Sequence, residues 1–352
     1  MPEADNPMKA MVLRGKSLAV ESVQQPVPGP GQVLARVLAC GICGSDLHAA
    51  KYMDDMIAAS RMSGSVAWDT QDQDAGIVMG HEFVAEVVQA GPGAEAWAPG
   101  TRVTSIPVLI DPAAPNGMVA IGYSTKFPGA YSEYVLMSAP MLLKVPDSVS
   151  DRVAATTEPC AVGLHAVREA RMQPGESAIV MGAGPIGLMT LLWLKKEGAK
   201  HVTVSEYAAP RRALASQLGA DLVVNPAEQD LAAIALEATG APTPVVFECV
   251  GVEGTLRQAM ELAGRLGRVV VVGVCMKEDR IFPMVGINKQ LTLQFVLGYT
   301  PAEYAEALAA LGDGSIDTSP MVTRTVGIDE LPSAFEALAD PHDCKVVLLP
   351  NG

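Results

Sequence analysis

The sequence holds a group of side chains that can bind a metal ion. Cys40 and Cys43 lie in the stretch CGICGSDLH, His81 and Glu82 lie in the stretch GHE, and Glu158 lies in the stretch TEPCAVGLH. Thiolate, imidazole and carboxylate groups are common zinc ligands, and three ligands from separate segments would leave a fourth position open. An open position is typical of catalytic rather than structural zinc, so the pattern favours a catalytic metal site.

Two other interpretations of the Cys-x-x-Cys pair are weaker. Half of a structural zinc site would need a second cysteine pair, and residues 82–159 contain no cysteine. A redox pair would fit a thioredoxin-like strand–helix–strand context, which the surrounding sequence lacks.

A second motif predicts a dinucleotide site. The stretch GAGPIG comprises Gly182, Gly184, Pro185, Ile186 and Gly187, directly after a predicted strand and at the start of a predicted helix. The first glycine allows a tight turn, the second lets the backbone approach a pyrophosphate, and the third permits close packing of helix and strand. The helix N-terminus attracts the phosphates. This context favours cofactor binding over a purely structural turn.

Glu206 indicates which dinucleotide would bind. It ends the next predicted strand, where its carboxylate can accept hydrogen bonds from ribose hydroxyls and would repel a 2′-phosphate. Arg211 and Arg212 follow and could accommodate that phosphate, although we prefer to interpret them as helix-surface charges. The sequence therefore predicts NAD and leaves NADP as the less favoured alternative.

The elements that must position these residues are of two kinds. The first 150 residues form short predicted strands, among them 33–39 and 83–89, and indicate a mostly β domain. From residue 177 onward, apolar strands alternate with helical patterns, which indicates an α/β domain with a parallel sheet covered on both faces. The strands are predicted at 178–181, 202–205, 222–224, 245–249, 269–272 and 291–296, and the helices at 185–196, 210–218, 230–238 and 255–263. A helix at 301–311, a helix at 330–339 and a strand at 345–349 follow.

Composition excludes some classes of partner. The 352 residues carry a formal net charge of −14, which argues against nucleic acid or an anionic membrane surface as a partner. The N-terminal stretch lacks the basic and apolar regions of a secretory signal. Six cysteines without a framework spacing suit a reducing cytoplasm, and we expect a cytoplasmic protein.

The order of the motifs resembles the zinc-containing medium-chain dehydrogenase/reductase family, which includes alcohol, sorbitol, butanediol and threonine dehydrogenases. The matching stretches are CGICGSDLH, GHEFVAEVV, GTRV, GAYSEYV, TEPCAVGLHAV, VMGAGPIGLM, ECVG, RVVVVG and CKVVLL, which run from near residue 8 to residue 349. The resemblance implies a doubly wound Rossmann domain at 154–296. It also implies a GroES-like, mostly β catalytic domain at 1–153 that resumes at 297–352.

The resemblance also implies residue roles in the catalytic domain. Cys43, His81 and Glu158 match the zinc ligands, and Glu82 matches a glutamate that lies behind the metal or replaces a ligand. Ser45 resembles the hydroxyl beside the substrate. His48 resembles the solvent end of a proton relay, with a hydrogen-bonded surface histidine as the alternative. In this comparison Cys160 is a core thiol and Asp46 a local turn or helix cap.

The implied reaction is a reversible oxidation of a secondary alcohol or polyol to a ketone or aldehyde. Zinc acts as a Lewis acid that makes the alcohol more acidic, and hydride passes to the nicotinamide. Besides the GAGPIG residues and Glu206, the cofactor-binding residues implied are Arg211, Val250 and Gly273. Two alternatives are a zinc-free quinone or enone reductase of the same superfamily and a non-catalytic dinucleotide-binding protein.

Two departures from the family pattern carry expectations. The lobe at 103–127 contains no cysteine, so we expect one catalytic zinc ion per chain and no structural zinc. A homodimer and a homotetramer both stay open, because relatives use this lobe in subunit contacts. Second, the segment 51–78 is longer than usual and contains Tyr52, Met53, Met56 and Trp68. We expect it to form part of the substrate pocket rim, with the outer surface or a subunit contact as the alternative.

Overall fold

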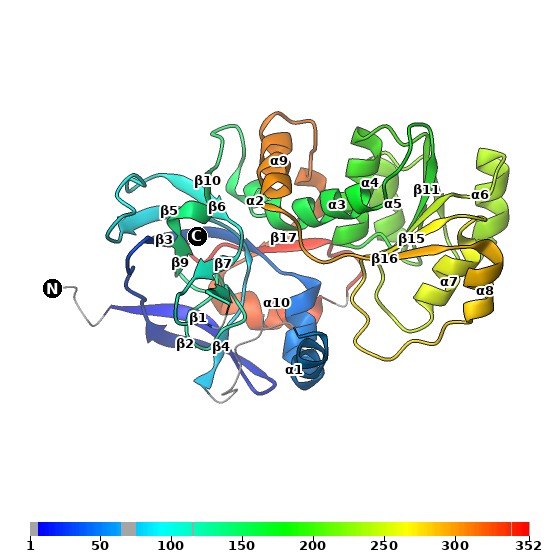
Figure 1. The fold of residues 1–352 in the computed structure, drawn as a ribbon. Helices are drawn as coiled ribbons and strands as arrows, with labels where there is room; N and C mark the ends of the chain where they lie inside the picture. The colour runs from blue at the N-terminus through cyan, green and yellow to red at the C-terminus, as the bar shows by residue number, and fades with distance from the viewer. Residues whose placement is uncertain (1–5, 65–74, 115, 339, 352) are drawn as a thin grey trace. The chain divides into compact units, whose positions relative to one another are not determined.

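The computed structural model describes residues 6–64, 75–114, 116–338 and 340–351. The chain folds into two compact units, each labelled by its elements in Figure 1. The first unit comprises Met1–Glu158 and Val322–Gly352, and the second comprises Pro159–Met321. No described helix combines the length and the apolar character that crossing a membrane requires.

The main sheet of the first unit has the strand order β10-β6-β5-β3-β18-β17, and β9 pairs with β3. Its central strand β3 pairs antiparallel with β5, β9 and β18. The chain's last strand therefore lies beside one of its first. The bounds are β3 Gln32–Gly41, β5 Glu82–Ala90, β6 Arg102–Ser105, β9 Tyr134–Ser138, β10 Leu142–Lys144, β17 Val322–Val326 and β18 Lys345–Leu348.

Smaller elements complete the first unit. A second sheet has the order β2-β1-β4, and β7 pairs with β8 as a hairpin in the lobe without cysteines. The strand bounds are β1 Pro7–Arg14, β2 Ser17–Gln24, β4 Ile77–Val78, β7 Val108–Ile110 and β8 Met118–Ala120. The helices are α1 Gly44–Ser63, α2 Asp151–Ala154 and α10 Leu331–Ala337, with short 3-10 turns η2 Ala139–Met141 and η4 Ile328–Glu330.

The second unit is built on a parallel sheet in the order β13-β12-β11-β14-β15-β16. The direction of winding reverses beside β11, the first strand in sequence, as in a doubly wound fold. All five residues of β11 are buried, because helices cover both faces of the sheet. The bounds are β11 Ser177–Met181, β12 His201–Ser205, β13 Leu222–Val224, β14 Val245–Glu248, β15 Arg268–Val271 and β16 Thr292–Phe295.

Figure 1 shows α4 and α7 on opposite sides of these strands. One face packs α6 and α7 through Leu231 and Met260 against strand residues that include Ile179 and Val246. The helices of the unit are α3 Thr157–Glu169, α4 Pro185–Lys196, α5 Ala209–Gln217, α6 Leu231–Thr239, α7 Thr255–Leu262, α8 Pro283–Lys289 and α9 Pro301–Gly312, with a 3-10 turn η3 Ser319–Met321. The fold class is thus α/β, with a Rossmann-type α/β unit and a GroES-like β unit in one chain.

The return to the first unit differs from the expected position at residue 297. The stretch 297–321 belongs by its contacts to the second unit. Its helix α9 is held on α3 by an ion pair of Arg168 with Glu306 at 2.7 Å and by a contact of His165 Nδ1 with Glu303 Oε2 at 3.0 Å. These contacts hold α9 on α3, and the boundary at residue 297, which the family resemblance implied, did not take them into account.

Candidate active site

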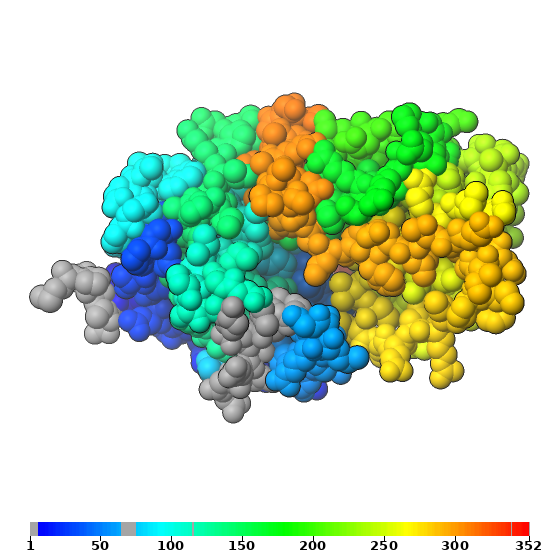
Figure 2. All heavy atoms as spheres, in the orientation of Figure 1, coloured from blue at the N-terminus to red at the C-terminus, as the bar shows by residue number. Residues whose placement is uncertain are grey.

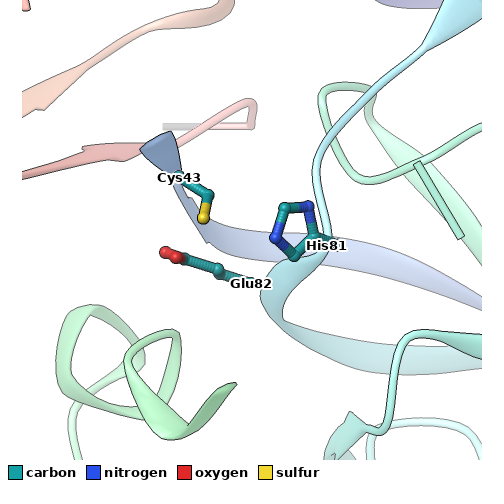
Figure 3. Close-up of side chains that lie close together, drawn as sticks. All are labelled: Cys43, His81 and Glu82. Carbon is teal, nitrogen blue, oxygen red and sulfur yellow. The ribbon is translucent and has the colours of Figure 1, made fainter. Parts of the chain in front are cut away.

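Cys43, His81 and Glu82 are brought together by two neighbouring strands. Cys43 follows β3 and caps α1, whereas His81 immediately precedes β5, which begins at Glu82. The strands pair so that Gly41 lies opposite Glu82. Figure 3 shows the three side chains pointing toward one another, and their ligand atoms all lie within 4.8 Å of one another. A sulfur, a nitrogen and an oxygen at this separation fit the ligand preferences of zinc.

A glycine makes room for the Glu82 carboxylate. A Cβ atom at Gly41 would lie 2.1 Å from Glu82 Oε2, so a side chain there would displace the Glu82 carboxylate from its position next to Cys43 and His81. The absence of a side chain at Gly41 is thus a packing requirement of the group of Cys43, His81 and Glu82, called the metal-binding cluster below.

Behind His81 lies Asp46, which the sequence suggested only as a turn or helix cap. Its Oδ1 is 3.3 Å from His81 Nδ1, and its Oδ2 accepts hydrogen bonds from Tyr131 Oη at 2.6 Å and from the Cys43 backbone N–H at 3.2 Å. Asp46 therefore caps α1 and also orients the imidazole, as carboxylates commonly do for metal-binding histidines. The capping-box position was visible in the sequence, but the contact with His81 was not.

The contact between Asp46 and His81 shifts the pKa values of both residues in the metal-free protein. Burial by itself raises the pKa of Asp46, but the charge of His81 and hydrogen bonds from His81, Tyr131 and Cys43 outweigh it and lower that pKa. Burial lowers the pKa of His81, but the Asp46 carboxylate outweighs burial and raises it well above its ordinary value. Both shifts favour an ion pair, which holds the imidazole ring in place.

Lys345 is a second residue that the sequence did not assign to the site. It begins β18, and its Nζ donates to Glu82 Oε1 at 2.8 Å, to Glu82 Oε2 at 2.7 Å and to the carbonyl oxygen of Ile42 at 3.0 Å. Lys345 and Glu82 are both buried, so each charge depends on the other for compensation. The signal was the lysine of the CKVVLL stretch, but only strand pairing brings it to Glu82.

The charges around Cys43 affect its ionisation in opposite directions. Burial, followed by the Glu82 carboxylate, raises the pKa of the Cys43 thiol, and His81 and Lys345 act against that rise. A bound cation would favour the thiolate, because metal-coordinated thiols lose their proton.

Ser45 reaches the same cluster from the first turn of α1. Its Oγ lies 3.1 Å from Cys43 Sγ and 2.7 Å from Tyr123 Oη. His48 lies one turn further along α1 and is half-buried, and its Nδ1 has no hydrogen-bond partner among the described residues. Burial, followed by the charge of Lys51, lowers the pKa of His48.

Glu158 lies in the first turn of α3 and is half-buried, but it is not part of the group formed by Cys43, His81 and Glu82. Its neighbour Cys160 is fully buried, and its carbonyl oxygen accepts a hydrogen bond from Trp193 Nε1 at 2.9 Å. Burial raises the pKa of the Cys160 thiol to about 12. A protonated, enclosed thiol fits the expected core role of Cys160.

The GAGPIG turn joins β11 to α4. A Cβ atom at Gly187 would lie 2.0 Å from the carbonyl oxygen of Gly182, so helix and strand approach too closely for any side chain there. A Cβ atom at Gly184 would meet nothing within 4 Å, which leaves that backbone open to a ligand. Pro185 is the first residue of α4, where its fixed φ and missing N–H suit a helix start.

Glu206 folds back onto the backbone beside this turn. Its Oε2 accepts from the Ala183 N–H at 2.9 Å, and its Oε1 accepts from the Ala208 N–H at 2.8 Å. Arg212 donates to the carbonyl oxygen of Glu206 at 3.1 Å, while Arg211 lies half-buried in the same helix, α5. The carboxylate is thus held at the end of β12, where the sequence predicted it.

Val250 follows the carboxyl end of β14, the neighbour of β11, and Gly273 follows the carboxyl end of β15, the neighbour of β14. Glu248 Oε1 accepts from the Val250 N–H at 2.8 Å, and the carbonyl oxygen of Glu248 accepts from the Gly273 N–H at 2.9 Å. A Cβ atom at Gly182 would lie 2.9 Å from Val250 Cγ2, which places Val250 against the glycine turn. In doubly wound sheets ligands bind at this edge of the strands.

The described residues of the segment 51–78 include regular structure: residues 51–63 belong to α1 and residues 77–78 form β4. Helix α1 continues through Ser63 with one kink at Tyr52, and Met53 is buried in the core of the first unit. Met56 packs against the same core, because helical spacing places it near Met53. Trp68 lies outside the described residues.

The metal-binding cluster and the doubly wound sheet define the class of the protein as a zinc-binding, nicotinamide-dependent dehydrogenase. Residues 29–147 match the family described as alcohol dehydrogenase GroES-like domain, and residues 185–313 match the family described as zinc-binding dehydrogenase. The chain belongs to the zinc-type medium-chain alcohol dehydrogenase family.

Several relatives align over nearly the whole chain. The (R,R)-butanediol dehydrogenase of Bacillus subtilis is 33% identical over 345 residues, which cover 96% of this chain and 97% of the relative. The crystal structure of the 2R,3R-butanediol dehydrogenase from Bacillus subtilis has a TM-score of 0.85 at 32% identity and covers 98% of this chain and 100% of that one. The L-threonine 3-dehydrogenase of Rhizobium rhizogenes is 28% identical, covering 97% of this chain and 99% of that one.

Similar structures have been solved with a dinucleotide bound, and one of them carries NADP. A zinc-binding dehydrogenase from Sinorhizobium meliloti bound to NADP is 28% identical, has a TM-score of 0.85 and covers 98% of this chain and 100% of that one.

Proposed function

We propose that the protein oxidises a secondary alcohol or polyol to a ketone or aldehyde, reversibly, with NAD as hydride acceptor and one zinc ion per chain. The observation that carries this proposal is the group of Cys43, His81 and Glu82, with the Ser45 hydroxyl 3.1 Å from Cys43 Sγ. The printed names of two relatives denote secondary alcohols, butanediol and the side chain of L-threonine. We extend that substrate class to this chain.

We assign Cys43, His81 and Glu158 as the zinc ligands and Glu82 as the carboxylate behind them. Both oxygens of Glu82 already accept from Lys345, which supports a ligand position filled by another carboxylate. Bound zinc would supply Lewis-acid chemistry that makes an alcohol more acidic.

The chain's own residues would orient the reactants. Ser45 offers a hydroxyl oxygen to the substrate hydroxyl, and Asp46 keeps the imidazole of His81 turned toward the cluster. Gly184 leaves the backbone open for the pyrophosphate, and the N-terminus of α4 attracts its charge. His48 would pass the released proton toward water.

NAD is favoured over NADP because the Glu206 carboxylate is fixed at the end of β12 by two backbone N–H groups. A 2′-phosphate at the adenosine ribose would meet that negative charge. The NADP-bound relative from Sinorhizobium meliloti supports NADP as the alternative cofactor, and Arg211 is then the cation that would bind the 2′-phosphate.

A single zinc ion is favoured because other contacts hold the lobe that lacks cysteines. Leu109 is buried in the core of the first unit, and the Ser138 hydroxyl accepts from the Ile110 N–H at 2.7 Å. Lys126 and Asp111 form an ion pair across the lobe.

We also propose that two copies of the chain associate through the edge of the second sheet at β16. Exposed apolar side chains gather in the sequence around this strand and α8: Phe282, Ile287, Phe295 and Leu297. Figure 2 shows the segment from α8 to β16, in gold and orange, at the viewer's side of the molecule. An exposed apolar edge strand is a template for pairing with another strand. Light scattering of the purified protein would test this, and a monomer at micromolar concentration would contradict it.

The function is tested with diols, sugar alcohols and cyclic and aromatic alcohols, each with NAD and with NADP, together with metal analysis. We expect turnover of secondary alcohols, a higher kcat/KM with NAD and one zinc ion per chain. Cys43→Ser should abolish turnover and leave the fold intact, and Cys275→Ser, which alters a half-buried cysteine of the second unit, is the matched control. Turnover of quinones by zinc-free protein, or two tightly bound zinc ions per chain, would refute the proposal.

A further inference from the structure

Tyr123 connects the cysteine-free lobe to the metal-binding cluster. It lies three residues after β8, and its ring centroid is 5.2 Å from that of His81, with an angle of 37° between the planes. Its Oη is 2.7 Å from Ser45 Oγ and donates to Asp46 Oδ1 at 3.1 Å. The sequence motifs did not single out this tyrosine.

The chemistry of these groups sets the direction of their hydrogen bonds. An ionised carboxylate only accepts, so the single proton of the Tyr123 hydroxyl goes to Asp46. The Tyr123 oxygen then accepts the proton of the Ser45 hydroxyl at 2.7 Å. With its proton engaged, the Ser45 oxygen keeps its lone pairs for another hydroxyl.

We propose that Tyr123 is a positioning residue for the reaction: it orients the Ser45 hydroxyl so that its oxygen accepts a hydrogen bond from the substrate alcohol. This inference rests on the proposed function, in which Ser45 lies beside the substrate. Without the Tyr123 hydroxyl, Cys43 Sγ at 3.1 Å is the acceptor left to Ser45, and the hydroxyl would turn toward it. A turned hydroxyl presents its lone pairs in another direction.

Tyr131 provides a matched control. Its hydroxyl donates to Asp46 Oδ2 at 2.6 Å and lies 3.4 Å from the Gly41 carbonyl oxygen, and no hydrogen bond of Tyr131 to Ser45 is found among the described residues. Tyr123→Phe and Tyr131→Phe each remove one hydroxyl donor to Asp46, but only the first removes the acceptor of Ser45. An effect that acts through Asp46 alone would therefore be seen in both variants.

The experiment combines Tyr123→Phe, Tyr131→Phe and Ser45→Ala in two double-mutant cycles on the zinc-loaded enzyme. We expect Tyr123→Phe to lower kcat about tenfold with little change in KM, in zinc content or in the Kd for NADH. Combined with Ser45→Ala it should lower kcat no further than Ser45→Ala alone, because both changes remove the same oriented oxygen. Tyr131→Phe should combine additively with Ser45→Ala.

A second measurement does not depend on turnover. The same variants are unfolded with urea in metal-free protein. The decrease in urea midpoint of the double variant Tyr123→Phe with Ser45→Ala should be smaller than the sum of the decreases of the two single variants. An unchanged kcat in Tyr123→Phe, or additivity of Tyr123→Phe with Ser45→Ala in both measurements, would overturn the inference. If the wild-type protein oxidises no alcohol, the proposed function fails instead, and the unfolding cycle still reports on the Ser45–Tyr123 contact.

Discussion

The metal-binding cluster and the Rossmann-type unit differ in the groups that donate hydrogen bonds to their carboxylates. In the metal-binding cluster, side chains compensate the carboxylates: Lys345 donates to Glu82, and two tyrosines and His81 surround Asp46. In the Rossmann-type unit, backbone N–H groups bind each of the carboxylates Glu206, Glu248 and Glu303, although Glu303 also accepts from the Thr300 hydroxyl and contacts His165 Nδ1. The backbone N–H groups that donate to these carboxylates lie in turns, at a strand end or at the N-terminus of a helix.

This difference has a physical consequence. A backbone donor is present as long as the local chain conformation is kept, so a carboxylate bound to it tolerates changes elsewhere. A buried lysine or tyrosine comes from a distant segment, and its removal leaves an uncompensated charge. We therefore expect the first unit to be far more sensitive to single substitutions at its site than the second.

The largest effect is expected for Lys345→Met. The substitution leaves the Glu82 carboxylate buried without its cation, which should lower the free energy of unfolding by about 3–5 kcal/mol. Lys195→Met is the matched control in the second unit, because Lys195 pairs with Asp221 at 2.9 Å with about a third of each side chain exposed. Exposed pairs contribute about 0–1 kcal/mol. Both values are measured by urea unfolding of metal-free protein.

A double variant keeps this test decisive if Lys345→Met does not fold. Glu82→Gln removes the charge that Lys345 compensates, so Lys345→Met combined with Glu82→Gln should recover much of the lost stability. Equal losses in Lys345→Met and Lys195→Met would contradict the contrast between the two units.

The next largest effect concerns Glu82, a member of the group of Cys43, His81 and Glu82, and Glu158, which we propose as the third zinc ligand. If Glu158 is the third ligand, Glu158→Ala should weaken zinc binding about 100-fold or more, which is about 2.7 kcal/mol. Glu82→Gln should weaken it less, about tenfold, as expected of a group behind the ligands. Competition with a chelator of known affinity measures both. A larger loss in Glu82→Gln would make Glu82 the ligand.

A smaller effect separates folding from cofactor binding in the GAGPIG turn. Gly187→Ala places a Cβ atom 2.0 Å from the Gly182 carbonyl oxygen and should cost about 1–3 kcal/mol of stability. Gly184→Ala meets no protein atom within 4 Å and should leave stability unchanged while raising the Kd for NADH about tenfold. Thermal unfolding and fluorescence titration give the two quantities. Stable Gly184→Ala protein with unchanged NADH affinity would remove Gly184 from the binding site.

The smallest effect is a pH dependence at Glu303. Burial raises the pKa of Glu303, but hydrogen bonds from Thr300 and His165 outweigh it and lower the pKa below the usual 4.5. A lowered pKa stabilises the folded protein above pH 4.5, and this contribution is lost as the pH falls through the folded pKa. The Glu303→Gln protein should therefore have a free energy of unfolding about 1–2 kcal/mol lower than the wild type at pH 7, and this difference should shrink as the pH falls. A gap that stays constant with pH would rule out this charge effect.

Much of the second unit could be predicted from the sequence. The predicted strand 222–224 and the helix 185–196 coincide with β13 and α4, and the other parallel strands differ by one residue or so at their ends. Apolar runs bounded by turns are a local signal, so the position of each strand can be recognised without information from distant segments. The GAGPIG turn and Glu206 are equally local, because the residues that shape them follow one another closely.

The first unit could be predicted less well. The metal-ligand motifs were visible, but α1 was missed beyond its first turn because its polar and apolar residues show little helical periodicity. The return at residue 322 was also missed, since the contacts that hold α9 to α3 link residues far apart in the sequence.

The sequence by itself determined which residues can bind zinc and dinucleotide, because each motif carries its chemistry in adjacent positions. Only the tertiary structure placed Lys345 on Glu82, Asp46 behind His81 and Tyr123 on Ser45. Strand pairing between β18 and β3, strand pairing between β3 and β5, and the loop after β8 bring these groups together across 263, 35 and 78 residues respectively. Contacts over such separations depend on the packing of the whole unit, which no local pattern encodes.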